Sequence, residues 1–231
     1  MSEQAIEKAQ KNFLHRNLAN IVSIVGVLPL ALLYFEGGYH YLIPLIIFNN
    51  VMDDLDGILA AKLDIRSRFG ADLDNVCDAV AHVALALAVG AHFGGITLGA
   101  SVIAAGAVIL RATSRLNPEG ASGGSPTNEL MRHLLFVLLL SAVFDFEVEP
   151  MLIIVFLLNA ASMSVPFKMT AMLRAQAKSA LSVGLVNIAL IAAWLLPSIT
   201  AYIATPFLLS YLYAFLVGGM QWIRARELHD K

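Results

Sequence analysis

Eight long apolar runs, separated by short polar breaks, constrain the fold of this chain more than any other feature. A helix that crosses a bilayer needs roughly 20 mainly apolar residues to span the hydrocarbon core. The composition agrees, because 58% of the residues are hydrophobic, 14% are charged and the mean hydropathy is +0.75. An ordinary soluble domain has a different balance. The sequence therefore predicts an all-α polytopic membrane bundle of about eight transmembrane helices, near residues 17–35, 41–61, 70–91, 97–112, 129–145, 151–167, 179–196 and 202–222.

The positive charges are distributed asymmetrically along this pattern. If the eight helices alternate in direction, all 15 Lys and Arg residues fall on one side of the membrane. The loops of the other side contain no Lys or Arg, and they carry the acidic residues Glu36, Asp145, Glu147 and Glu149. Positive residues remain in the cytoplasm, so we expect both termini to be cytoplasmic, as in a multi-pass protein of a bacterial inner membrane. A bundle of six helices would leave two apolar runs outside the bilayer and spoil this asymmetry.

The N-terminal segment differs from the rest of the chain. Within residues 1–16, Ile6, Ala9 and Phe13 recur at helical spacing among charged residues. This pattern favours an amphipathic helix in the membrane interface, and an ordinary surface helix is the alternative. We expect the remainder, residues 17–231, to form one transmembrane catalytic domain. The net charge of −2 gives no reason to expect a nucleic-acid partner.

Aspartates gather where the second predicted helix ends and the third begins. Asp53 and Asp56 are three residues apart, and Asp74 and Asp78 are four apart, so each pair projects from one face of its helix. Carboxylates in membrane helices are costly and usually functional. Two facing pairs would repel each other unless they bind a divalent cation, and oxygen ligands favour Mg²⁺ or Mn²⁺. The sequence therefore predicts a metal site that acts in phosphoryl transfer.

Small residues share the faces that carry these aspartates. Gly57, Ala60 and Gly70 lack bulk, which would let a flat or phosphorylated ligand approach the backbone. Close packing between helices is the alternative explanation, because small residues are common where membrane helices meet.

The spacing of these residues resembles the pattern of the CDP-alcohol phosphotransferases, D-x-x-D-G-x-x-A-R-x8-G-x3-D-x3-D. One position departs from it: the arginine is replaced by Ala61, with Lys62 next. One residue rotates a helical side chain by about 100°, so Lys62 is at best a partial substitute. Residues 67–74 look most like bacterial phosphatidylserine synthases. Seven of the eight motif positions match, namely Asp53, Asp56, Gly57, Ala60, Gly70, Asp74 and Asp78.

The resemblance implies an enzyme with two metal ions, Mg²⁺ or Mn²⁺. Asp53, Asp56, Asp74 and Asp78 would bind the ions that hold the pyrophosphate of a CDP-linked donor, and Asp78 would also deprotonate the acceptor hydroxyl. The family further implies a homodimer. Asn20 and Ser23 are similar to a family segment that opens the first span, although polar residues near a helix start are also caps. The expected contacts of the CDP moiety are Asn20, Ser23, Asp53, Gly57, Ala60, Gly70 and Asp74.

Further candidates for binding the acceptor lie beside the motif. His82, one turn beyond Asp78, could line the acceptor pocket or assist proton transfer, or form a hydrogen bond between helices. Basic residues at predicted cytoplasmic helix ends could hold an anionic headgroup or a carboxylate, or anchor the helices to anionic lipid. They are Arg111, Arg115, Lys168 and Arg174, of which the first two share one helix face. Asp54 and Asp72 lie off the motif, and we expect them to face solvent or bind loops.

The sequence is compatible with several functions. CDP-diacylglycerol could pass its phosphatidyl group to a small polar alcohol, with serine as a guess, and release CMP. Alternatively, CDP-choline or CDP-ethanolamine could pass its headgroup to diacylglycerol, since residues 74–78 are similar to those of members that use these donors. A cation transporter would also place aspartates in membrane helices, but it does not require the fixed Asp and Gly spacing. A non-catalytic scaffold is a further alternative, because of Ala61.

Overall fold

The computed structural model describes residues 13–116, 127–167, 169, 171–177 and 179–229. Within them the regular structure is entirely helical, which confirms the predicted all-α class. Residues 13–16 are helical, and the rest of the expected interfacial helix lies outside the described residues. The elements are α2 (Leu18–Val27), η1 (Leu28–Tyr34), η2 (Gly38–Tyr41), α3 (Leu42–Lys62), α4 (Arg68–Phe93), α5 (Gly95–Leu116), α6 (Thr127–Phe144), α7 (Val148–Ser164), α8 (Leu173–Gln176), α9 (Ala180–Leu195) and α10 (Pro197–His229).

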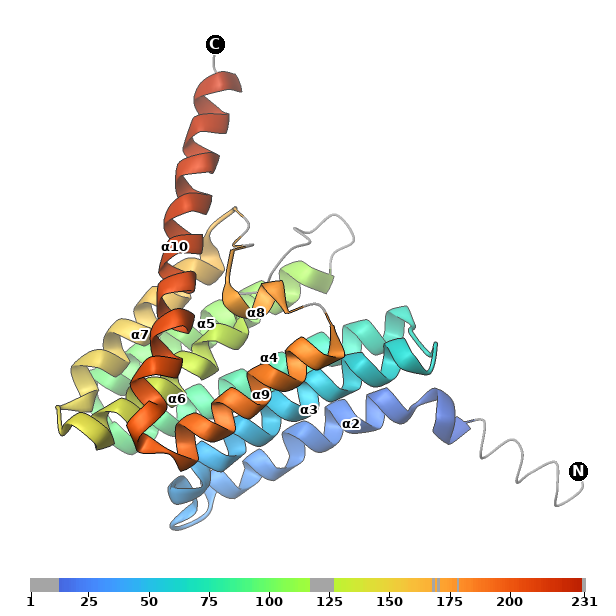
Figure 1. The fold of residues 1–231 in the computed structure, drawn as a ribbon, viewed down its shortest axis with the longest axis horizontal. Coiled ribbons are helices and arrows are strands. Elements are labelled where there is room, and N and C mark those ends of the chain that lie inside the picture. Colours follow the sequence, from blue (N-terminus) through green and yellow to red (C-terminus); the bar gives the residue numbers. More distant parts are fainter. Residues whose placement is uncertain (1–12, 117–126, 168, 170, 178, 230–231) are drawn as a thin grey trace, which may run out of the picture.

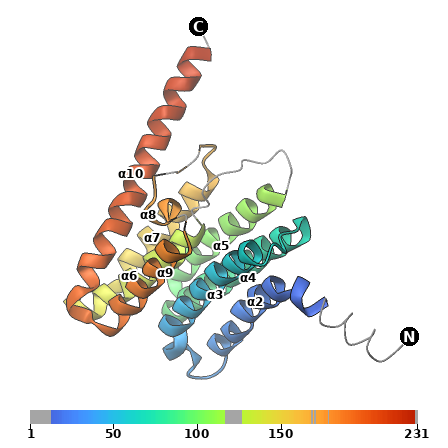
Figure 2. The ribbon, with the colours of Figure 1, turned by 45° about the vertical axis from the view of Figure 1, so that its right-hand side comes forward.

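Seven of the eight predicted apolar runs correspond to one helix each, and the first corresponds to α2 together with η1. Figures 1 and 2 show α2 to α7 and α9 running side by side, whereas α10 crosses them and its C-terminal half extends past the bundle. The first run is divided, because α2 continues as a 3₁₀ helix where Pro29 occupies one of its first positions. The short helix α8, which the sequence pattern did not predict, lies in the connection between α7 and α9.

Four helices are long and apolar enough to cross a membrane, namely α4, α5, α6 and α10 over Pro197–Glu227. The chain is therefore an integral membrane protein by its helices, but the expected count of eight spans is not confirmed. Three apolar helices are shorter, at 17 residues for α2 with η1, 17 for α7 and 16 for α9. The helix α3 has 21 residues, but it carries three aspartates and Lys62.

The core lies where α4, α5, α6 and α7 pack together. Leu85, Val89, Leu134, Phe136 and Phe156 are completely buried there. Large apolar side chains also cover the outer surface, which is the arrangement expected where the surrounding medium is lipid. The most exposed of them include Ile96, Leu181 and Tyr202, each at least three-quarters exposed.

Gly90 sets the close approach of α4 and α5. A Cβ atom at this position would lie 1.9 Å from the Ser101 hydroxyl and 3.2 Å from the Leu98 Cα, so the two helices would have to separate. We expect Gly90→Ala to lower the free energy of unfolding by about 1–3 kcal/mol, the usual effect of overpacking. Thermal unfolding in one detergent measures this effect. Gly99→Ala is the matched control, because a Cβ there meets no atom within 4 Å, and equal melting temperatures for the two variants would contradict the prediction.

Candidate active site and metal centre

The turn between α3 and α4 brings the two aspartate segments together. The helix α3 ends at Lys62, and Asp64 adopts a left-handed backbone conformation with φ of 54°. Aspartate tolerates this conformation better than most residues. Ser67 then caps α4, because its hydroxyl accepts a hydrogen bond from the Gly70 amide at 3.0 Å. The last turns of α3 therefore lie beside the first turns of α4.

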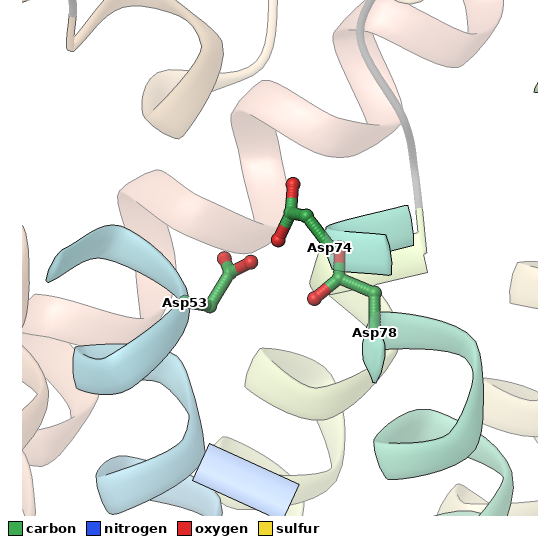
Figure 3. A group of neighbouring side chains, drawn as sticks. All are labelled: Asp53, Asp74 and Asp78. Atoms are coloured by element: carbon green, nitrogen blue, oxygen red, sulfur yellow. The ribbon is translucent and has the colours of Figure 1, made fainter. Parts of the chain in front are cut away.

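Three aspartates form the centre of the site. Asp53 of α3 and Asp74 and Asp78 of α4 place carboxylate oxygens within 4.8 Å of one another, and Figure 3 shows the three side chains pointing toward a common space. Carboxylates at this separation in a partly buried site repel each other strongly. A divalent cation with oxygen ligands would offset that repulsion. The donor set fits Mg²⁺ or Mn²⁺, because it consists of hard carboxylate oxygens.

Asp56 lies beside this group, and its carboxylate is oriented by α2. Its side chain is buried and accepts a hydrogen bond from the Ser23 hydroxyl. Asp56 is not one of the three residues in the closest set, but it lines the same small cavity as all three and Ser23. The structure thus brings together the four aspartates that the motif predicted, with one turned toward α2. Their role as ligands stays a prediction.

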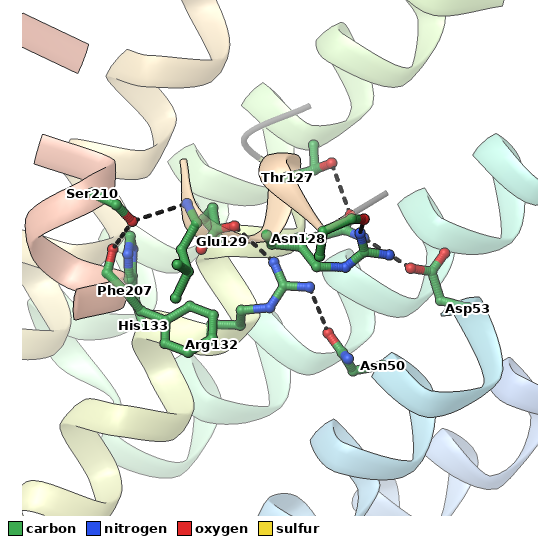
Figure 4. Close-up of polar contacts among 12 residues, drawn as sticks. Asn50, Asp53, Thr127, Asn128, Glu129, Arg132, His133, Phe207 and Ser210 are labelled. Atoms are coloured by element: carbon green, nitrogen blue, oxygen red, sulfur yellow. Dashed lines mark hydrogen bonds and ion pairs between the residues drawn. The ribbon is translucent and has the colours of Figure 1, made fainter. Parts of the chain in front are cut away.

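Asn128, at the start of α6, orients the carboxylate of Asp53. Its Nδ2 donates a hydrogen bond to Asp53 Oδ2 at 2.9 Å, as Figure 4 shows. The sequence pattern did not predict a role for this residue. The only available signal was an amide side chain at the beginning of a predicted helix, which is also a common capping position.

A pocket of about 710 Å³ opens over the aspartates. This volume falls within the range of sites that hold small molecules. Acids and bases both line it, and they come from α3 to α6, α8 and the turn after α3. The charged lining residues are Asp53, Asp54, Asp56, Asp74, Asp78, Glu129, Lys62, Arg66, Arg115, Arg132 and Arg174.

Comparison with known families identifies the chain. The family described as CDP-alcohol phosphatidyltransferase matches residues 16–223, which is most of its length. The chain belongs to this family. The CDP-alcohol phosphatidyltransferases are membrane phosphotransferases, and divalent metal ions are typical of the family. No curated protein and no solved structure is detectably similar to the chain.

The small residues of the motif have different surroundings. A Cβ at Gly57 would meet no atom within 4 Å, and Gly57 lines the pocket, so its lack of bulk leaves room for a ligand. A Cβ at Gly70 would lie 3.1 Å from Asn20 Oδ1 and from Ser67 Oγ, which favours close packing there. Ala60 accepts a hydrogen bond from the backbone of Ile65 at the turn. Asn20 donates to Asn17 Oδ1 at 3.1 Å.

The residues expected to bind the acceptor are not all brought together. Arg115 lines the pocket, whereas Arg111 is buried one turn deeper in α5. His82 is buried, and its Nδ1 lies 2.5 Å from the backbone oxygen of Asp78 in the same helix. Ala61, in place of the motif arginine, also lines the pocket. Lys168 lies outside the described residues.

Proposed function

We propose that the protein transfers the phosphatidyl group of CDP-diacylglycerol to the hydroxyl of a small polar alcohol and releases CMP. The observation that supports this most strongly is the convergence of Asp53, Asp56, Asp74 and Asp78 at the floor of a pocket that also carries basic residues. These four aspartates would hold two Mg²⁺ or Mn²⁺ ions. When bound, such ions supply positive charge beside the pyrophosphate and favour departure of CMP.

The reaction assigns a role to Asp78. The acceptor oxygen forms a bond to the phosphorus that carries diacylglycerol, and the bond between that phosphorus and the oxygen bridging to CMP breaks. Asp78 would take the proton of the acceptor hydroxyl. A carboxylate can do so where the alcohol lies within hydrogen-bond reach. Asp78 lies one turn deeper than Asp74 on the same face of α4, and it lines the pocket that would hold the acceptor.

The charges of the pocket favour an acceptor that carries an anionic group. Arg132 pairs with Glu129 at 2.7 Å, and Arg174 pairs with Asp54. The positive charge of two divalent ions would balance the negative charge of the four motif aspartates. Among the described lining residues, the cations left over are Lys62, Arg66 and Arg115, and their positive charge exceeds the negative charge of one pyrophosphate diester. Serine would offer its carboxylate to them, whereas CDP-choline would bring a further cation, so we favour the phosphatidyl donor and take serine as the first acceptor to test.

We also propose that the chain crosses the membrane eight times, with the site facing the cytoplasm. The helix α2 and the more extended η1 together rise about 29 Å, which is close to the thickness of a hydrocarbon core. In Figure 1 the turn after α3 lies at the end of the bundle opposite to the connections of α4 to α5, α6 to α7 and α9 to α10. Every Lys and Arg falls on the side of the α3 turn by the sequence pattern.

The proposed reaction is tested by CMP release from purified, lipid-reconstituted protein. We expect release from CDP-diacylglycerol that requires Mn²⁺ or Mg²⁺ and an acceptor, with serine compared against inositol, glycerol phosphate and choline. A second arm supplies CDP-choline or CDP-ethanolamine with diacylglycerol. Release only in the second arm would overturn the proposed donor. Absence of release in both arms, together with unaltered nucleotide binding in Asp56→Ala, would overturn the enzymatic function.

Arg115 tests the anionic acceptor site. We expect Arg115→Gln to raise KM for the acceptor about tenfold with kcat changed less than about threefold, because it removes a charge-assisted hydrogen bond and leaves the metal ligands in place. Steady-state CMP release at saturating donor measures both constants. Arg68→Gln is the control, because Arg68 is an exposed cation at the start of α4 and pairs with Asp72 at 3.8 Å. A selective fall in kcat would show that Arg115 does not bind the acceptor.

A further inference from the structure

Asp54 points away from the cluster formed by its neighbour Asp53. Consecutive helical side chains diverge by about 100°, so Asp54 faces α8 and α9 rather than α4. Asp54 is buried, so the expectation that it faces solvent was wrong. The alternative expectation, contact with a loop, agrees with its contact to Arg174 in the connection between α7 and α9. Its carboxylate accepts hydrogen bonds from the Arg174 guanidinium, from Asn187 Nδ2 at 2.7 Å and from Asn50 Nδ2 at 3.4 Å.

The contacts of Asp54 continue into a network that joins four helices. Asn50 donates to Asn187 Oδ1 at 2.7 Å and accepts from Arg132 at 2.9 Å, and Figure 4 shows this last contact. Arg132 in turn pairs with Glu129. The network therefore links α3, α6, α8 and α9, and its four charged residues line the pocket.

The connection between α7 and α9 forms part of the pocket wall. Met172, Arg174, Ala177 and Ser179 line the pocket from this segment. The helix α8 has only four residues, which is too short to be stable by itself. Polar contacts attach this segment to the rest of the protein: Leu173 donates its backbone N–H to Ser210 of α10, and Arg174 binds Asp54 of α3. The ion pair is thus the charged contact that holds α8 on α3.

We propose that Asp54 and Arg174 are positioning residues that hold this wall against α3, and that Asp54 is not a metal ligand. The wall would shape the pocket for the donor, so the kinetic part of the proposal rests on the proposed function. The pair is asymmetric, because the Asp54 side chain is 2% exposed and that of Arg174 is 26% exposed. Loss of the arginine leaves a buried, unpaired carboxylate, whereas loss of the carboxylate leaves a cation that can reach water.

This asymmetry makes a double-mutant test specific. Met172→Cys in a Cys77→Ala background places one thiol in the wall itself, where the native side chain is buried against Tyr211 of α10. We expect Arg174→Gln to raise the rate of maleimide labelling about tenfold and Asp54→Asn to raise it less. The double variant should return to the rate of Asp54→Asn. Asp72→Asn is the control, because it removes the same charge from the exposed surface of α4.

Kinetic and metal measurements separate the possible outcomes. Asp54→Asn should raise KM for CDP-diacylglycerol with a smaller change in kcat, and Mn²⁺ binding measured by electron paramagnetic resonance should stay within about twofold. Equal labelling rates for all variants, or weakened Mn²⁺ binding in Asp54→Asn, would overturn the proposal. If Arg174→Gln loses CMP release and the double variant does not recover it, Arg174 binds the substrate directly and does not act through Asp54. Labelling that follows the expected order in a protein that releases no CMP from CDP-diacylglycerol would support the wall while overturning the proposed reaction.

Discussion

Asp78→Asn is expected to reduce kcat for CMP release by about 10³-fold or more. The substitution removes the proposed base, and a positioned general base contributes roughly 10²–10⁴-fold to a rate. It also removes one negative charge from a group whose oxygens lie within 4.8 Å of Asp53 and Asp74, so Mn²⁺ should bind more weakly. Single-turnover CMP release and Mn²⁺ titration by electron paramagnetic resonance measure the two effects independently.

The control for Asp78→Asn is a carboxylate on the same helix. Asp72 lies two turns before Asp78 and pairs with Arg68 on the surface, so Asp72→Asn should change both quantities less than about twofold. If Asp78→Asn kept its Mn²⁺ affinity but lost turnover, the residue would act as a base without binding metal. If it kept both, the assignment of the catalytic centre to this cluster would be wrong.

Glu129→Gln is expected to have the largest effect on stability. Glu129 is 3% exposed and Arg132 is 1% exposed, and their charged atoms lie 2.7 Å apart. Neutralising the glutamate would leave a buried guanidinium with the Asn50 oxygen as its remaining partner in the described network. Breaking such a pair from one side costs about 3–5 kcal/mol. The melting temperature in detergent and the helical signal in circular dichroism should both reveal the loss.

Two comparisons make the Glu129 prediction specific. Glu149→Gln, at the exposed start of α7, makes the same chemical change without a buried partner and should leave the melting temperature nearly unchanged. The double replacement Glu129→Leu and Arg132→Met should be more stable than Glu129→Gln, because removal of both charges leaves none unpaired. A double variant less stable than the single one would mean that the pair itself, rather than the unpaired cation, determines the stability.

The helices and the motif were readable from the chain because they depend on local periodicity. The six runs from the second to the seventh appeared as helices within a few residues of their predicted bounds, whereas the last helix, α10, extends five residues before and seven beyond the predicted 202–222. The aspartate spacing places Asp74 and Asp78 on one face without further information. The division of the first run into α2 and η1 was not predicted, although a proline such as Pro29 can produce it. The count of crossings depends on helix length and on the charges in α3, which carries three aspartates and Lys62.

An all-helical membrane chain with an acidic motif follows from the order of the residues, because helical period and hydropathy act over neighbouring residues. Which polar groups meet at that motif depends on how the helices pack. Asn128 contacts Asp53 across 75 residues, and Arg174 contacts Asp54 across 120. Such pairs leave no periodic signal, since they depend on how α6 and α8 pack against α3. Adjacent aspartates consequently have different surroundings, with Asp53 in the carboxylate cluster and Asp54 in the pocket wall.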